Sequence, residues 1–160
     1  MNREKQRIFE NLDRAIIKFR GIYSEWANKW GISYHEMLVL YSIRETGFCT
    51  QKQICGNYLL PKQTVHHVIT ILREEGILEY DEVHSRGREK AFALSEKGRQ
   101  YAAPFLQSLN DVEERALELL GAENLEMITE LLLKYDRALN QAVEESTSKR
   151  GASEGKKKIR

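Results

Sequence analysis

The sequence predicts a mainly α-helical protein with one small β-hairpin, and three observations lead to this fold class. Apolar residues recur every three or four positions along most of the 160 residues, which is the period of an amphipathic helix. Only two short runs, residues 77–81 and 91–94, have the composition of strands. Glycine and proline separate these segments where helices and turns are expected to end. The length and an apolar content of 41% favour one domain with helical extensions.

The first predicted helix covers residues 4–30. Its apolar residues alternate steps of four and three, as in the seam of a packed helix: Ile8, Leu12, Ile16, Phe19, Tyr23, Trp26 and Trp30. At about 1.5 Å per residue, this helix would be about 40 Å long, which is too long for one small core. We therefore expect part of its apolar face to contact another chain. Gly31 is expected to end it.

Three short helices are predicted next. Ser33 and Glu36 form a capping-box pattern at the start of the segment 34–45, and Thr50 and Gln53 repeat the pattern before a third helix. The fourth helix, residues 61–75, has Pro61 in its first turn and Gly76 after its end. Its apolar stripe consists of Val65, Val68, Ile69 and Leu72, and its polar side of Gln63, His66, His67, Thr70 and Glu74.

A β-hairpin is predicted after the fourth helix, with a basic tip that contains Arg86, Gly87, Arg88 and Lys90. Ser95 begins another helix, which Pro104 should kink unless this residue lies near its beginning. After Gly121, a last helix is expected from about residue 122 to 145, with the stripe Leu125, Ile128, Leu132, Tyr135, Leu139 and Ala142. Short helices followed by a hairpin are typical of a winged helix-turn-helix.

Charge is distributed unevenly, although the net charge is only +1. Residues 51–73 hold three basic residues, two histidines and no acids, whereas residues 100–148 hold ten acids and three bases. Residues 149–160 are basic again, with six bases and one acid. Positive charge therefore gathers around the fourth helix, the hairpin tip and the tail. This pattern permits nucleic-acid binding without establishing it.

The polar side of the fourth helix and the hairpin tip are candidate DNA contacts. Major-groove contacts are expected from Lys62, Gln63, Thr64, His66, His67 and Thr70, because such side chains can bond base edges and phosphates. Phosphate contacts are expected from Gln51, Lys52 and Arg73, and minor-groove contacts from Arg86, Arg88 and Lys90. The alternatives are a solvated helix face, a capping or packing role for Thr64, an acidic partner for Arg73 and a merely charged loop.

This organisation predicts four regions. Residues 1–32 would form an N-terminal dimerisation helix, 33–99 the winged helix-turn-helix DNA-binding domain, 100–146 C-terminal dimerisation helices and 147–160 a disordered basic tail. The winged core could bury its own apolar residues without the terminal helices. The apolar seams of these helices therefore indicate a dimerisation layer. A two-fold dimer would place two recognition helices one DNA turn apart, about 34 Å.

Several of these segments resemble the MarR family of bacterial transcriptional regulators over roughly residues 5–145. The resemblance rests on Thr64-Val65, on Leu72 to Leu78 around Gly76, on the basic tip after Asp81 or Glu82, and on Leu94-Ser95-Glu96-Lys97-Gly98. It implies a homodimer that binds a palindromic operator in double-stranded DNA and is often released by a small ligand. One departure is His84-Ser85, where many relatives carry an arginine.

The resemblance also implies an effector site, since relatives often bind phenolic anions between the dimer layer and the DNA-binding lobe. Aromatic residues that could line such a crevice for a small phenolic or other aromatic effector are Tyr23, Trp26, Trp30, Tyr34 and Tyr41. The alternative is that these rings are plain core, as aromatic stripes at helical spacing usually are.

Other classes of function find little support. Cys49 and Cys55 suggest reduced, cytosolic thiols, and relatives that sense peroxides keep the reactive thiol in the first helix, which has none here. His66 and His67 are adjacent and point about 100° apart on a helix, so no metal site is expected. Neither a catalytic motif nor a cofactor motif is present, and no apolar run is long enough to span a membrane.

We expect a cytoplasmic transcriptional regulator that acts as a repressor and not as an activator. The alternatives are a winged-helix protein-interaction module and a non-specific architectural DNA binder.

Overall fold

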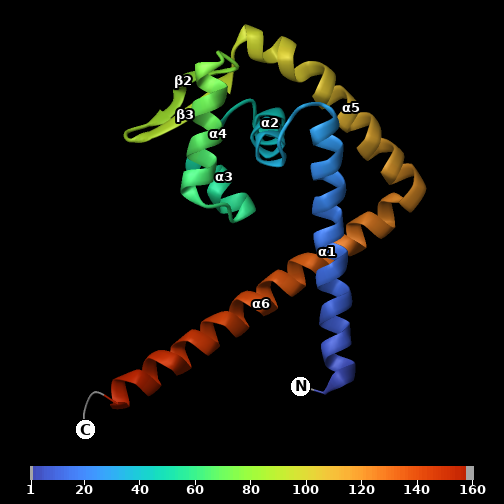
Figure 1. The fold of residues 1–160 in the computed structure, drawn as a ribbon, viewed down its shortest axis with the longest axis vertical. Coiled ribbons are helices and arrows are strands. Elements are labelled where there is room, and N and C mark those ends of the chain that lie inside the picture. Colours follow the sequence, from blue (N-terminus) through green and yellow to red (C-terminus); the bar gives the residue numbers. More distant parts are fainter. Residues whose placement is uncertain (1, 158–160) are drawn as a thin grey trace. The chain divides into compact units, whose positions relative to one another are not determined.

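The computed structural model describes the backbone of residues 2–157 and the side chains of residues 2–148 (Figure 1). In this part the elements follow in the order α1 (Arg3–Lys29), α2 (Tyr34–Thr46), β1 (Cys49–Thr50), α3 (Gln51–Tyr58), α4 (Lys62–Glu74), β2 (Leu78–Arg86), β3 (Glu89–Leu94), α5 (Glu96–Leu120) and α6 (Ala122–Lys157). The mainly helical fold class with a small β-wing is confirmed. The chain forms two compact units, which meet in sequence between Leu109 and Asn110.

Helices α2 and α3 begin at the caps that the sequence predicts. The Ser33 hydroxyl accepts a hydrogen bond from the Glu36 backbone N–H at 3.2 Å. Thr50 and Gln53 form a complete capping box, with the two reciprocal bonds at 3.1 and 2.8 Å. Unlike the Gln53 side chain, the Glu36 carboxylate accepts a hydrogen bond from the Tyr101 hydroxyl at 2.7 Å. This bond fastens the start of α2 to α5.

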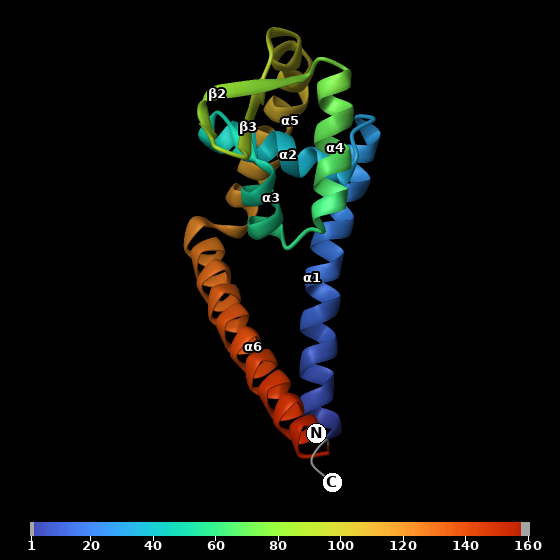
Figure 2. The ribbon, with the colours of Figure 1, turned by 90° about the vertical axis from the view of Figure 1, so that its left-hand side faces the viewer.

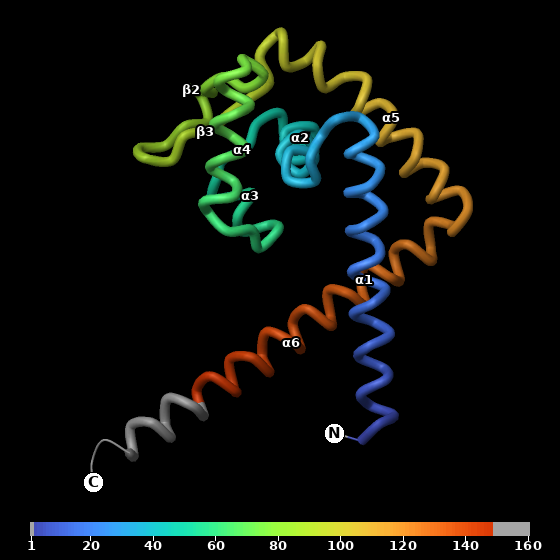
Figure 3. The backbone as a smooth tube through the Cα atoms, viewed as in Figure 1, coloured from blue at the N-terminus to red at the C-terminus, as the bar shows by residue number. Residues whose placement is uncertain are grey.

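The turn between α3 and α4 is tight and is made by Leu59, Leu60 and Pro61 (Figure 3). Leu59 has a φ of +50°, the left-handed conformation that glycine usually provides. Pro61 stands at the N-cap position, one residue before α4, and not inside its first turn. Its fixed φ of −58° leads the chain directly into the helix.

The three strands form an antiparallel sheet in the order β1-β3-β2, and β2 and β3 lead away from the end of α4 (Figure 2). Strand β2 extends beyond the predicted residues 77–81, and it bulges between Asp81, which pairs with Ala91, and Arg86, which pairs with Glu89. In this bulge the Ser85 hydroxyl donates to the Asp81 carbonyl and accepts from the Ala91 N–H. A side chain thus replaces the missing backbone ladder.

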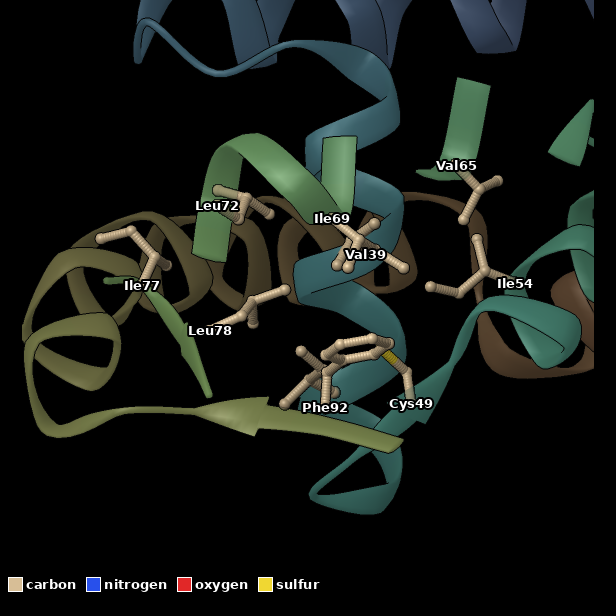
Figure 4. Packing of buried hydrophobic residues seen from close by; sticks show 10 residues of the cluster. Val39, Cys49, Ile54, Val65, Ile69, Leu72, Ile77, Leu78 and Phe92 are labelled. Carbon is tan, nitrogen blue, oxygen red and sulfur yellow. The ribbon is translucent and has the colours of Figure 1, made fainter. Parts of the chain in front are cut away.

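Two hydrophobic cores hold the first unit together. The first lies under the wing, and α4 turns the side chains of Val65, Ile69 and Leu72 into it (Figure 4). Figure 4 also shows the Cys49 sulfur beside the Phe92 ring, in line with their pairing across β1 and β3. The second core joins the ends of α1 and α2 to α5: Ala27, Ile32, Met37, Leu38, Leu40, Ala102, Phe105 and Leu109. Helix α2 contributes to both cores, so it is buried on two sides.

The segment Leu94 to Gly98 fastens the wing and α5 to the end of α4. The Ser95 hydroxyl donates to the Gly76 carbonyl at 2.6 Å and accepts from the Gly98 N–H at 2.9 Å. A Cβ on Gly98 would stand 2.0 Å from the Ile77 carbonyl oxygen, so only glycine fits there. This part of the family motif therefore has a structural role.

The last helix is longer than the sequence predicts. Helix α6 continues to Lys157, and so enters the segment 147–160 that we predicted to be disordered; residues 158–160 lie outside the described residues. Its residues lack an apolar stripe there, but they also lack proline, the residue that most strongly ends a helix. Pro104 lies inside α5, as expected if it does not begin the helix. Among the described residues, no helix is both long enough and apolar enough for a membrane span.

Candidate DNA-binding surface

Helix α4 has the two-sided character that a DNA-reading helix needs. Its apolar stripe is buried in the first core, whereas Lys62, Gln63, His66 and His67 are exposed. Thr64 and Thr70 are half-buried at the edges of the polar face. The polar face is therefore open to solvent and not covered by its own chain, as predicted.

Helix α3 holds the start of α4 through one of the predicted contact residues. The Gln51 side-chain amide donates to the Lys62 backbone carbonyl at 2.8 Å, so this donor already has a partner within the chain. Lys52 follows on α3 and remains exposed. The structure thus gives Gln51 a positioning role in addition to the phosphate contact that we predicted.

A groove of about 590 Å³ lies between α3, α4 and the wing. Cys55, Ile69 and Phe92 contribute apolar surface to it, and Glu89 is the one acid of its lining. Eight of the twelve predicted DNA-contact residues line this groove: Gln51, Lys52, Lys62, His66, Thr70, Arg73, Arg88 and Lys90. The structure therefore brings together residues from three elements that are separated in the sequence. Gln63, Thr64, His67 and Arg86 are not part of the lining.

The cations of the wing are held in different ways. The Arg86 guanidinium donates to the Val83 and Ser85 carbonyls at 2.7 and 3.0 Å, so it folds back on its own hairpin. Arg88 and Lys90 are exposed, and no ion pair in the described part of the chain engages either of them. The Glu89 carboxylate accepts the Thr50 hydroxyl at 2.6 Å, which ties the wing to β1. Arg88 and Lys90 are thus the wing cations most available to a polyanion.

His84, the departure from the family pattern, lies in the bulge of β2. Its ring stacks on Phe48 with centroids 3.9 Å apart and planes inclined by 9°. Its Nδ1 lies 2.7 Å from the Asp81 carboxylate, which also accepts the His84 backbone N–H. Hydrogen bonds from the His84 side chain and backbone lower the pKa of Asp81. No sequence pattern indicates the contact with Phe48, because the two residues come from separate segments.

The predicted effector residues lie around the second core. Tyr23, Trp26, Tyr34 and Tyr41 pack against this core, and the Trp26 and Phe105 rings lie 5.0 Å apart. The ring centroids of Trp30 and Phe105 lie 6.1 Å apart, and Trp30 remains partly exposed. These are packing contacts, and the effector-binding role of the five residues stays a prediction.

The thiols have surroundings that favour structural roles. Cys49 is 1% exposed, and burial raises the pKa of its thiol to about 12, so it is a poor nucleophile at neutral pH. Cys55 is half-buried at the groove. Among the described residues there is no group of three or more histidines, cysteines and acids that could hold a metal ion.

Comparison with known proteins points to one family. No family model matches the chain, and no curated protein matches it. Among solved structures it is similar to NMB1585, a MarR family regulator from Neisseria meningitidis, with 26% identity, a TM-score of 0.78, and 91% of this chain and 99% of that chain covered.

Two other solved structures show the same fold at lower identity. NadR, in complex with 4-hydroxyphenylacetate, has 15% identity and a TM-score of 0.66 over 80% of this chain and 91% of its own. Overoxidised AbfR, bound to DNA, has 20% identity and a TM-score of 0.63 over 87% of this chain and 99% of its own. Over nearly all of its length the chain therefore has the winged helix-turn-helix fold of these proteins and resembles the MarR family transcriptional regulators.

Proposed function

We propose that the protein is a homodimeric, sequence-specific DNA-binding transcriptional regulator. The observation that carries this proposal is the exposed polar face of α4, which borders a groove whose other wall is a wing with exposed cations. If the polar face of α4 were merely a solvated surface, nothing would call for a second cationic element on the opposite side of the groove. Both together match what duplex DNA presents, since bases lie in the major groove between two phosphate backbones.

In this proposal α4 enters the major groove. Gln63 and His67 are exposed on α4 and lie outside the lining of the protein's own groove. Both side chains suit contacts with base edges. The cations at the rim, Lys52 and Lys62, suit phosphate contacts, which orient the protein without reading sequence. Arg88 at the wing tip suits a narrow minor groove, where arginine is attracted by the enhanced negative potential.

Dimerisation is supported by apolar surface on each unit. In the first unit, α1 exposes Ile8, Ile17, Phe19 and Ile22. In the second unit, apolar side chains are exposed along the helices as Leu119, Leu125, Met127, Ile128, Leu131, Leu132, Leu133, Leu139 and Val143. Apolar side chains exposed in such number along a helix usually mark an interface. A second copy of the chain would cover it and would give the symmetric pair of α4 helices that a palindrome requires.

Repression released by a small aromatic anion is the regulatory mode we propose. A bound dimer would block a promoter, and an effector would act by favouring a dimer whose α4 helices have the wrong spacing. Support comes from NadR, whose structure holds 4-hydroxyphenylacetate, and from the aromatic side chains around the second core. Titrating salicylate-like anions against a protein–DNA complex tests this mode, and no change in affinity at millimolar concentration would contradict it.

Selection of bound duplexes from a random pool tests the main proposal. We expect recovery of a palindrome with half-sites about ten base pairs apart, and an affinity that falls steeply with salt. Enrichment of no sequence, with binding retained, would instead indicate an architectural DNA binder. Failure to bind any duplex would contradict the proposal and favour a protein-interaction module.

A further inference from the structure

Arg73, near the end of α4, is held differently from the other cations of the groove. Its guanidinium carbon lies 4.0 Å from the centroid of the Tyr80 ring and 6.0 Å from that of Phe92. The two rings lie 5.4 Å apart on β2 and β3, where Tyr80 and Phe92 are register partners. The guanidinium therefore lies over the face of Tyr80 and close to Phe92, against two neighbouring rings that belong to the wing.

These two rings hold the guanidinium without consuming its hydrogen-bond donors. A guanidinium is attracted to the face of an aromatic ring, and its N–H groups can still bond other partners at the edges of its plane. Glu74 and Glu75 follow Arg73 directly, yet no ion pair in the described part of the chain joins Arg73 to an acid. The acidic partner considered from the sequence is therefore replaced by an aromatic one.

Tyr80 is large, aromatic and 45% exposed, and it lines the groove together with Arg73. An exposed ring that supports a cation beside a polyanion-binding groove has a clear physical role. It reduces the side-chain entropy that Arg73 would otherwise lose on contact with a phosphate.

We infer that Tyr80 is a positioning residue for DNA binding, whose ring, supported by Phe92, holds the Arg73 guanidinium toward the groove for contact with a backbone phosphate. This inference rests on the proposed function. The contact couples the wing to the end of α4, so the wing contributes to phosphate binding at a point far from its tip. The partner is the DNA sugar–phosphate backbone, and no base is read there.

The first test compares Arg73→Lys with the wild-type protein on a random-sequence duplex of about 30 base pairs, between about 50 and 200 mM salt. Lysine keeps the charge but not the flat stacking surface. We expect Arg73→Lys to weaken binding roughly three- to tenfold. The slope of log affinity against log salt concentration should also fall by about 0.9 for each phosphate that the variant no longer neutralises.

The matched control is Arg115→Lys, the same exchange on α5 outside the groove lining, which should bind like the wild type. Wild-type affinity in Arg73→Lys would overturn the inference, because charge alone would then suffice.

The second test separates the ring from its hydroxyl. Tyr80→Phe keeps the ring and should stay within about twofold of wild-type affinity, whereas Tyr80→Leu should weaken binding about as much as Arg73→Lys. The double variant Arg73→Lys/Tyr80→Leu should be no weaker than either single variant, since both remove one interaction. Additive losses, or an equal loss in Tyr80→Phe and Tyr80→Leu, would contradict the inference.

Two controls keep these results interpretable. Thermal unfolding of each variant shows whether the loss of the ring unfolds the wing; if Tyr80→Leu does not fold, Arg73→Lys still decides, since it leaves both rings in place. If the wild type itself binds no duplex, the proposed function fails. If the wild type binds and every variant matches it, only the role of Tyr80 fails.

Discussion

Two glutamines of the DNA-binding surface show how one side chain type can have two roles. Gln51 donates its amide to the Lys62 carbonyl and so holds α3 against α4. Gln63, one position after Lys62, is exposed on the polar face and is not part of the groove lining. Sequence alone assigned both to DNA, and only the structure separates the residue that positions α4 from the residue that can read a base.

We predict that Gln63→Ala weakens binding to the selected operator more than binding to random DNA. A glutamine amide can bond adenine with two hydrogen bonds, and such a pair discriminates bases by about 1–3 kcal/mol. Titrations on the two duplexes at one salt concentration measure the difference. Gln51→Ala is the comparison variant and should reduce both affinities alike; an equal reduction by Gln63→Ala would refute base reading by this residue.

Leu59 is a residue in an unfavourable place. It adopts the left-handed conformation and exposes 85% of its surface, so it has backbone strain and little compensating burial. We predict that Leu59→Gly stabilises the protein by about 0.5–1 kcal/mol, which is the strain of about 1–2 kcal/mol less the greater freedom of glycine in the unfolded chain. Urea unfolding measures this change. Leu59→Ala, which keeps the Cβ, should bring no such gain, and an equal gain would exclude backbone strain as the cause.

At the scale of elements, the sequence predicts what depends on local chemistry. The starts of α2 and α3 follow from Ser33 and Thr50, whose side chains cap them as expected. The two-residue strand β1 could not be predicted, because it is defined only by its pairing with β3. The bulge in β2 was missed for the same reason, since it depends on the Ser85 hydroxyl bridging two strands. The candidate surface follows the same rule: α4 and the wing cations were predicted, and the supporting contacts of Arg73 and His84 were not.

Thr50 joins three elements, so its substitution should affect all of them. Its hydroxyl accepts from the Gln53 N–H and donates to Glu89 in the wing. We predict that Thr50→Ala destabilises the protein by about 2 kcal/mol, because it removes both the helix cap and the hydrogen bond to a carboxylate. Denaturant unfolding measures this loss, and Thr50→Ser should recover most of it. If serine were as destabilising as alanine, packing of the threonine methyl group would be the cause.

At the scale of the whole molecule, the chain does not bury all the apolar surface that its sequence provides. The two cores belong to the first unit, and they leave much of α1 uncovered. The second unit likewise exposes the stripe predicted for α6, including Leu125, Ile128, Leu132 and Leu139. Helices of this kind gain stability mainly from packing of their apolar face. The terminal helices are therefore expected to be fully stable only in an assembly, which links their folding to dimerisation.

The stripe on α6 offers a direct test of that link. We predict that the wild type sediments at twice the 18.7 kDa of the chain, and that Leu132→Glu shifts it towards the monomer. A buried leucine contributes about 2 kcal/mol, and a two-fold interface holds each residue twice. The loss should therefore be at least about 4 kcal/mol, roughly a thousandfold in the dimer Kd.

The control is Lys134→Glu, which changes the charge even more. The Lys134 side chain is 65% exposed and lies off the apolar stripe, so this variant should leave the dimer intact. If dimers dissociate, binding to a palindrome should fall to that of a single half-site, because two recognition helices are then no longer joined. A monomeric wild type, or a Leu132→Glu variant that dimerises as well as Lys134→Glu does, would show that α6 does not form the interface.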